Sequence, residues 1–112
     1  MSVPRLNRAL VLEEAVRTAD GAGGFTLGWS ALGHLWAEIV FRSGREIGEA
    51  GGPMSVASYK ITVRGAPVGS TMRPRPDQRF REGLRLFRIL SVAERDAEGR
   101  YLLCIAQEEA AA

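Results

Sequence analysis

The residues of this chain that could act as acids, bases or nucleophiles do not stand in catalytic patterns. His34, the only histidine, lies between Gly33 and Leu35, and no serine–histidine–acid arrangement surrounds it to orient a general base. Cys104, the only cysteine, lies in an apolar run, which predicts a buried and inert thiol. One histidine and one cysteine cannot assemble a zinc site. We therefore expect no catalytic residue, no metal and no cofactor.

The carboxylates occur as neighbours along the chain, at Glu13–Glu14 and at Glu108–Glu109. Adjacent residues of a strand face opposite sides, so neither pair can converge on one substrate, and we interpret both as solvated charge. The segment 20–24 is glycine-rich but lacks the lysine and hydroxyl of a phosphate-binding loop. It predicts a tight hairpin turn in which glycines take positive φ.

Arginine is the residue type whose distribution is most informative. All but one of the fifteen basic residues are arginine, the exception being Lys60. Six arginines lie between Arg73 and Arg88, opposed only by Asp77 and Glu82, so this stretch carries +4 while the whole chain carries +2. Two interpretations stay open: an electropositive edge that contacts phosphates or a carboxylate-rich neighbour, or a solvated strand face with weak ion pairs.

The alternation of apolar and polar residues predicts short strands joined by turns, over residues 9–17, 25–29, 35–42, 56–64, 78–80, 84–90 and 101–107. Phe80, Leu84 and Phe87 also stand at helical spacing. Gly83 favours a hairpin there instead, with a turn over residues 81–83. Ser43 could cap a short helix, but the glycines that follow weaken it, so a loop over 43–55 is the alternative.

Length and composition favour one domain over residues 1–112. The chain is 46% hydrophobic and 25% charged, which is ordinary for a globular protein. No apolar run approaches the roughly 18 residues of a membrane span, and the N-terminus lacks the apolar core of a signal peptide. The expected fold class is all-β: a small β-barrel or sandwich of about six to eight strands, with one short helix or long loop between two central strands.

A series of sequence phrases points to a known family. They are Asp20-Gly21-Ala22-Gly23-Gly24-Phe25 before Trp29, Trp36-Ala37-Glu38-Ile39 before Ser43-Gly44-Arg45-Glu46, Tyr59-Lys60-Ile61-Thr62-Val63-Arg64, and Met72-Arg73-Pro74-Arg75. In this order and spacing they resemble the head–tail joining proteins of long-tailed bacteriophages and gene transfer agents, also called head-closure, stopper or adaptor proteins. The resemblance spans residues 6–108. One departure is that glycines weaken the polar helix that the family usually has after Ser-Gly-Arg-Glu.

The resemblance implies a small β-barrel whose copies form a ring, which we expect to be a hexamer, in the neck of a virion or phage-like particle assembled in the bacterial cytoplasm. Such a ring is a stopper that joins the portal or adaptor ring on the head side to the tail terminator and tail proteins, and it surrounds the DNA channel. The resemblance implies no membrane partner.

Two groups of residues would serve this ring. By position, the family's channel loop corresponds to residues 43–55, with a channel-lining and DNA-retaining role for Ser43, Gly44, Arg45, Glu46 and Glu49. The arginine stretch would contact another subunit or a neighbouring protein through Arg73, Arg75, Arg79, Arg81 and Arg85. The acidic residues Glu46, Glu49, Glu108 and Glu109 would then lie on a different face.

Two alternative functions remain. One is a portal-proximal head–tail adaptor, although adaptors are commonly more helical than this strand-rich chain. The other is a nucleic-acid-binding barrel that acts alone, for which DNA binding would decline steeply with salt.

Overall fold

The protein folds as a single sheet of six strands. A computed structural model describes residues 3–49 and 52–109, of which 45–49 and 52–55 are described by their backbone alone. The strands are β1 (Arg8–Ala19), β2 (Phe25–Glu49), β3 (Gly52–Arg64), β4 (Arg79–Glu82), β5 (Arg85–Glu94) and β6 (Tyr101–Glu109). No helix occurs in the described ranges, and the all-β prediction is confirmed.

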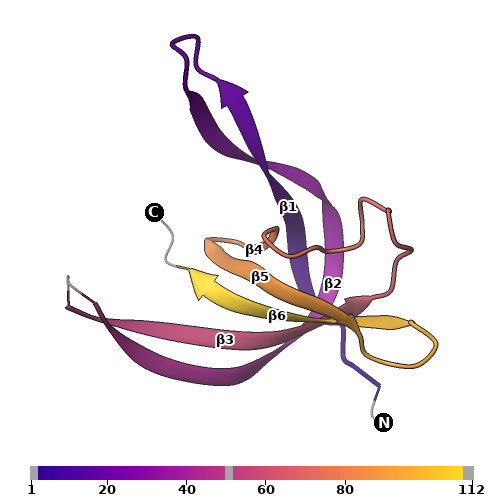
Figure 1. Ribbon diagram of the computed structural model, residues 1–112. Coiled ribbons are helices and arrows are strands. Elements are labelled where there is room, and N and C mark those ends of the chain that lie inside the picture. The colour runs from indigo at the N-terminus through magenta and orange to yellow at the C-terminus, as the bar shows by residue number, and fades with distance from the viewer. Residues whose placement is uncertain (1–2, 50–51, 110–112) are drawn as a thin grey trace.

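All neighbouring strands are antiparallel, and the sheet closes on itself as a small barrel in the order β1-β2-β3-β6-β5-β4 (Figure 1). The short strand β4 completes the ring because Leu12 of β1 pairs with Phe80 of β4. The inward side chains form one apolar core, made of Leu10, Leu12, Ala37, Ile61, Val63, Phe80, Phe87, Ile89, Leu102, Cys104 and Ala106. Within the predicted strand 56–64, Ile61 and Val63 belong to this core, and Thr62 between them is also only 4% exposed.

Strand β2 is one continuous strand of 25 residues, where the sequence predicted two separate strands. Its first part pairs with β1 and its second part pairs with β3, so two long hairpins leave the barrel in different directions (Figure 1). A β-bulge lies where β2 enters the barrel, because Gly33 pairs with Leu12 and Ala31 pairs with Glu13, which leaves Leu32 as an additional residue.

The short helix or loop predicted over residues 43–55 is wrong. Residues 43–49 and 52–58 are strand, paired from Ser43↔Ser58 to Glu49↔Gly52, and residues 50 and 51 lie outside the described residues. A short glycine-containing helix would have to nucleate alone, whereas extended backbone here continues the ladder between residues 37–41 and 59–63. The predicted hairpin at residues 20–24 is confirmed, with Gly21 and Gly23 at φ of 79° and 84°.

The long connection from β3 to β4, residues 65–78, crosses one end of the barrel. The N–H of Gly65 donates a hydrogen bond of 2.7 Å to the carbonyl oxygen of Arg100, and the Ile89 N–H donates one of 2.9 Å to the carbonyl oxygen of Gln78. The side chain of Met72 lies so close to Gly33 that a Cβ atom there would be 2.6 Å from its sulfur. These contacts fix the position of the arginines that follow.

Candidate functional site

The first arginine cluster lies on the outside of the barrel at the seam between β1 and β4. The Arg79 Nε donates to one Glu13 oxygen at 2.7 Å, and the Arg81 Nε donates to the other at 3.0 Å. The Arg79 guanidinium also lies over the Trp29 ring, 4.0 Å from its centre. Burial alone would raise the Glu13 pKa, but the hydrogen bonds from both arginines outweigh it and hold that pKa below its ordinary value. Glu13 is only 6% exposed, so its interpretation as solvated charge is wrong.

The second cluster occupies the inner side of the sheet at the barrel end where β4 meets β5. Arg85 donates two hydrogen bonds to the carboxylate of Glu108, at 2.9 and 3.1 Å, and Arg8 donates two of 2.6 Å to Glu82. The two pairs are joined, because Arg85 is also 3.6 Å from Glu82. The hydrogen bonds from Arg8 and Arg85 hold the pKa values of Glu82 and Glu108 below the ordinary glutamate value. The expectation that Glu108 lies on a face separate from the arginines is therefore wrong.

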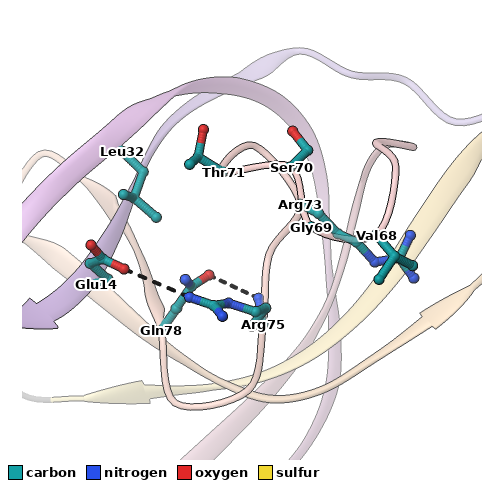
Figure 2. A pocket seen from close by; sticks show the side chains of 9 residues that line it. All are labelled: Glu14, Leu32, Val68, Gly69, Ser70, Thr71, Arg73, Arg75 and Gln78. Atoms are coloured by element: carbon teal, nitrogen blue, oxygen red, sulfur yellow. Dashed lines mark hydrogen bonds and ion pairs between the residues drawn. The ribbon is translucent and has the colours of Figure 1, made fainter.

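A cavity of about 380 Å³ lies between β1, β2 and the 65–78 connection (Figure 2). It contains the third part of the arginine stretch. Arg75 is 3.7 Å from the Glu14 carboxylate, and its backbone N–H donates to the side-chain oxygen of Gln78 at 2.9 Å. Arg73 donates to the carbonyl oxygen of Ala66 at 2.9 Å. Arg75, a cation at the border of the cavity, therefore already has an acidic partner in Glu14.

The net charge of +4 between residues 73 and 88 is largely compensated by acids from elsewhere in the chain. The stretch is neither a uniformly electropositive edge nor a fully solvated strand face. Glu13 makes a buried network with Arg79 and Arg81, while other arginines stay in solvent. The side chains of Arg75 and Arg88 remain 69% and 54% exposed. They are the members of the stretch most available to another molecule.

The residues expected at a DNA channel are brought together on the hairpin of β2 and β3. Ser43 lies on β2 opposite Ser58, the last residue at which β3 pairs with β6, and Gly44 lies beyond it; both are exposed. Arg45, Glu46 and Glu49 follow along the same strand, and only their backbone is described. The predicted group therefore forms part of a projecting hairpin, while the arginine stretch belongs to the barrel.

The groups considered for catalysis lie apart from both clusters. His34 is exposed on the outer side of β2, where it pairs with Val11. Cys104 lies in the core, as predicted, and burial raises the pKa of its thiol to about 12. Within residues 3–49 and 52–109 there is no group of three or more histidine, cysteine, aspartate or glutamate residues that could hold a metal ion. No helix in the described part of the chain is long and apolar enough to cross a membrane.

Sequence reasoning missed two features of these surfaces. The roles of Glu13 and Arg8 carry no local signal, because their partners lie 66 or more residues away in the chain. The exposed apolar side chains of Phe25, Leu27 and Trp29 do carry one, since they alternate along a strand after a hairpin turn. The hairpin turn predicts the strand, and this alternation indicates that one of its faces is apolar; the structure turns that face to solvent.

The chain is similar to proteins of phage and phage-like particles over nearly its whole length. The family described as phage head completion protein matches residues 1–109. A chain from a structure of the virion of a native gene transfer agent particle is 59% identical, with a TM-score of 0.85, and the match covers 98% of this chain and 100% of that one. No curated protein matches. This chain therefore belongs to the phage head completion protein family, a family of structural proteins of the phage head.

Proposed function

We propose that copies of this protein form a stopper ring in the neck of a virion or gene-transfer-agent particle. The ring joins the head to the tail around the DNA channel. The observation that supports this function most directly is the β2–β3 hairpin, which extends past the closed barrel over residues 44–49 and 52–57. A ring of such barrels, which we take to be a hexamer, can direct these hairpins toward a common axis. The similarity to a chain of a gene transfer agent virion supports a structural role in such a particle.

The hairpin has the composition expected of a surface that DNA must pass. Arg45 can contact phosphates, and Glu46 and Glu49 limit how strongly the backbone of DNA is held. Pairing across the hairpin lets it project without a helix. The barrel supplies the rigid base, because ion pairs join β1 to β4 and β5 to β6. We propose no catalytic step for this function.

The exposed arginines would meet a neighbouring ring. Arg75 and Arg88 lie on the barrel and not on the hairpin, so they can contact an acidic surface of the portal or adaptor ring, or of a tail protein, while the hairpins face the channel. Arg79, Arg81 and Arg85 would contribute mainly by holding the barrel closed, because each is bonded to a glutamate of this chain.

The proposed function is tested by shortening the hairpin in register. Arg45 pairs with Val56, so residues 46–55 can be replaced by Asn-Gly, the pair that favours a two-residue hairpin turn. In particles that carry this variant we expect heads and tails to join but packaged DNA to leak, as measured by nuclease-sensitive DNA and electron microscopy. The control replaces Gly28, on the other hairpin, with alanine, and should behave as wild type. Full DNA retention by the shortened variant would contradict a DNA-retaining role.

Two other outcomes would redirect the proposal. A ring found against the portal in a reconstruction of the particle would identify a head–tail adaptor. DNA binding by the isolated protein that falls steeply between about 50 and 200 mM salt would support a nucleic-acid-binding barrel acting alone. A stopper should bind DNA weakly in isolation and be recovered with particles.

A further inference from the structure

Strand β2 carries a row of large apolar side chains on the outer side of the sheet. Phe25, Leu27, Trp29, Trp36 and Val40 are 59%, 67%, 38%, 61% and 47% exposed, and both tryptophans of the chain are among them. Solvent-exposed aromatic residues at this density mark interaction surfaces more often than they mark ordinary monomer surface. We call this row the β2 stripe.

The bulge at Leu32 is what places the whole stripe on one face. Trp29 and Trp36 are seven residues apart, and in a regular strand an odd separation puts two side chains on opposite sides. Their partners on β1 are Ala15 and Ala9, which are six residues apart and alternate with the buried Leu10 and Leu12. Both tryptophans therefore lie outside, because the bulge adds one residue to β2 and none to β1.

The stripe has the size of one side of a specific protein interface. With about 150–250 Å² for a whole aromatic side chain, the five residues expose roughly 400–500 Å² of apolar surface. One side of a standard interface buries about 800 Å², of which a little over half is apolar. The whole stripe therefore matches the apolar part of one side of such an interface, and each half of the stripe supplies roughly half of that area.

A charged side chain of opposite sign lies beside each half of the stripe, Arg17 at the hairpin half and Glu38 at the barrel half, where the exposed Lys60 also lies opposite Val40. The half on the β1–β2 hairpin contains Arg17, whose guanidinium lies 4.5 Å from the centre of the Phe25 ring. The half on the barrel contains Glu38 between Trp36 and Val40, and its carboxylate accepts a hydrogen bond of 2.9 Å from the Arg5 N–H. Within the described residues neither charge has an ion-pair partner.

The hairpin half also needs a third element to cover it. Beyond Glu13 the hairpin has only two strands, because β4 pairs with β1 no further than that residue and β3 pairs with β2 only from Ala37 onward. A two-stranded hairpin with an apolar face is marginally stable in water unless another strand or surface packs on it. The barrel half of the same stripe offers such a surface, with the complementary charge.

We propose that a second copy of this chain covers the β2 stripe, with the hairpin half of one copy packed on the barrel half of the next. Phe25, Leu27 and Trp29 would lie against Trp36 and Val40 of the neighbouring copy, and Arg17 would pair with its Glu38. Each copy offers two different faces, so the contact is head-to-tail and can close into a ring. The inference rests on the proposed ring and identifies its subunit contact.

The contact is tested by photo-crosslinking in assembled particles that contain the full chain. Leu27 is replaced by benzoylphenylalanine, and Thr26, which faces the opposite side of the same hairpin, serves as the matched position. We expect light to produce a dimer of this chain from position 27 and little from position 26, with the crosslink on the peptide that contains Trp36 and Val40. A crosslink to a different protein, a crosslink elsewhere on this chain, or no crosslink would overturn the proposal.

A charge exchange provides a second measurement. Arg17→Glu and Glu38→Arg should each reduce the dimer crosslink from position 27 several-fold, and the double variant should restore it because the opposite charges are again matched. Failure of the double variant to restore the crosslink contradicts the pairing. Head–tail joining is scored in parallel in particles that lack this chain. Joining without the chain would contradict the proposed function, whereas failure to restore the crosslink contradicts only the subunit contact.

Discussion

Glu13 and Arg79 are joined by a hydrogen bond of 2.7 Å across the seam at which β1 and β4 close the barrel. The two residues are 66 positions apart in the chain, and both side chains are largely shielded from water. Arg81 binds the second oxygen of the same carboxylate. The closure of the sheet therefore depends on a charged network as well as on the apolar core.

Glu13→Gln should lower the free energy of unfolding by about 2 kcal/mol, because it leaves two arginines without the carboxylate that compensates them. Urea denaturation measures the change. The adjacent Glu14→Gln is the matched control and should cost no more than about 0.5 kcal/mol, since its ion pair with Arg75 is long and exposed. Equal effects of the two variants would contradict the role assigned to Glu13.

Stability should fall in acid through the carboxyl groups at the barrel end. Hydrogen bonds from Arg8 and Arg85 hold the pKa values of Glu82 and Glu108 below the unfolded glutamate value of about 4.3, so the unfolded state binds protons first as the pH decreases. We expect the melting temperature to be constant between about pH 7 and 5 and to decrease below about pH 4. In the double variant Glu82→Gln, Glu108→Gln this decrease should be smaller, and an unchanged profile would refute the assignment.

Charge reversal separates arginines that hold the barrel from those that can bind a neighbour. The double variant Arg75→Glu, Arg88→Glu should remain folded, with a loss below about 1 kcal/mol, because both side chains are exposed. It should nevertheless reduce head–tail joining in a complementation assay scored by electron microscopy. Arg64→Glu, an exposed change on β3 outside the stretch, is the control. Normal joining by the double variant would exclude these arginines from the neighbour contact.

Gly65→Ala should destabilise the barrel by about 2 kcal/mol or more, because the new Cβ would overlap the carbonyl oxygen of Gly99, which belongs to the backbone. Gly28→Ala should change stability by less than about 1 kcal/mol, since its Cβ would meet open space. Thermal unfolding of the two purified variants makes the comparison. Similar melting temperatures would show that the turn after β3 can move aside.

The Cys104 thiol should be unreactive in the folded protein. Burial raises its pKa to about 12, so almost no thiolate exists at pH 8. Reaction with a maleimide should be slow in buffer and complete within minutes in denaturant. Rapid labelling of the native protein would show that the core opens on the time scale of the experiment.

Local patterns in the sequence were sufficient for several elements of this fold. The period-two alternation of residues 56–64 predicted the strand β3, and the glycines after Asp20 predicted the first hairpin. Local patterns also predicted strands instead of a helix around Phe87, and a buried Cys104. Each of these features depends on neighbours within a few residues, so composition and spacing were enough to indicate it.

The tertiary structure alone decided the features that depend on register and closure. The bulge at Leu32 brings Trp29 and Trp36 to one face, and the pairing of β1 with β4 brings Glu13 to Arg79. A bulge shifts every residue after it to the other side without a strong sequence signal, and a barrel closes between strands that are distant in the chain. By itself the sequence therefore determined that the protein is a small all-β domain rich in arginine. The closure of the sheet decides which arginines and which aromatic residues remain exposed to solvent.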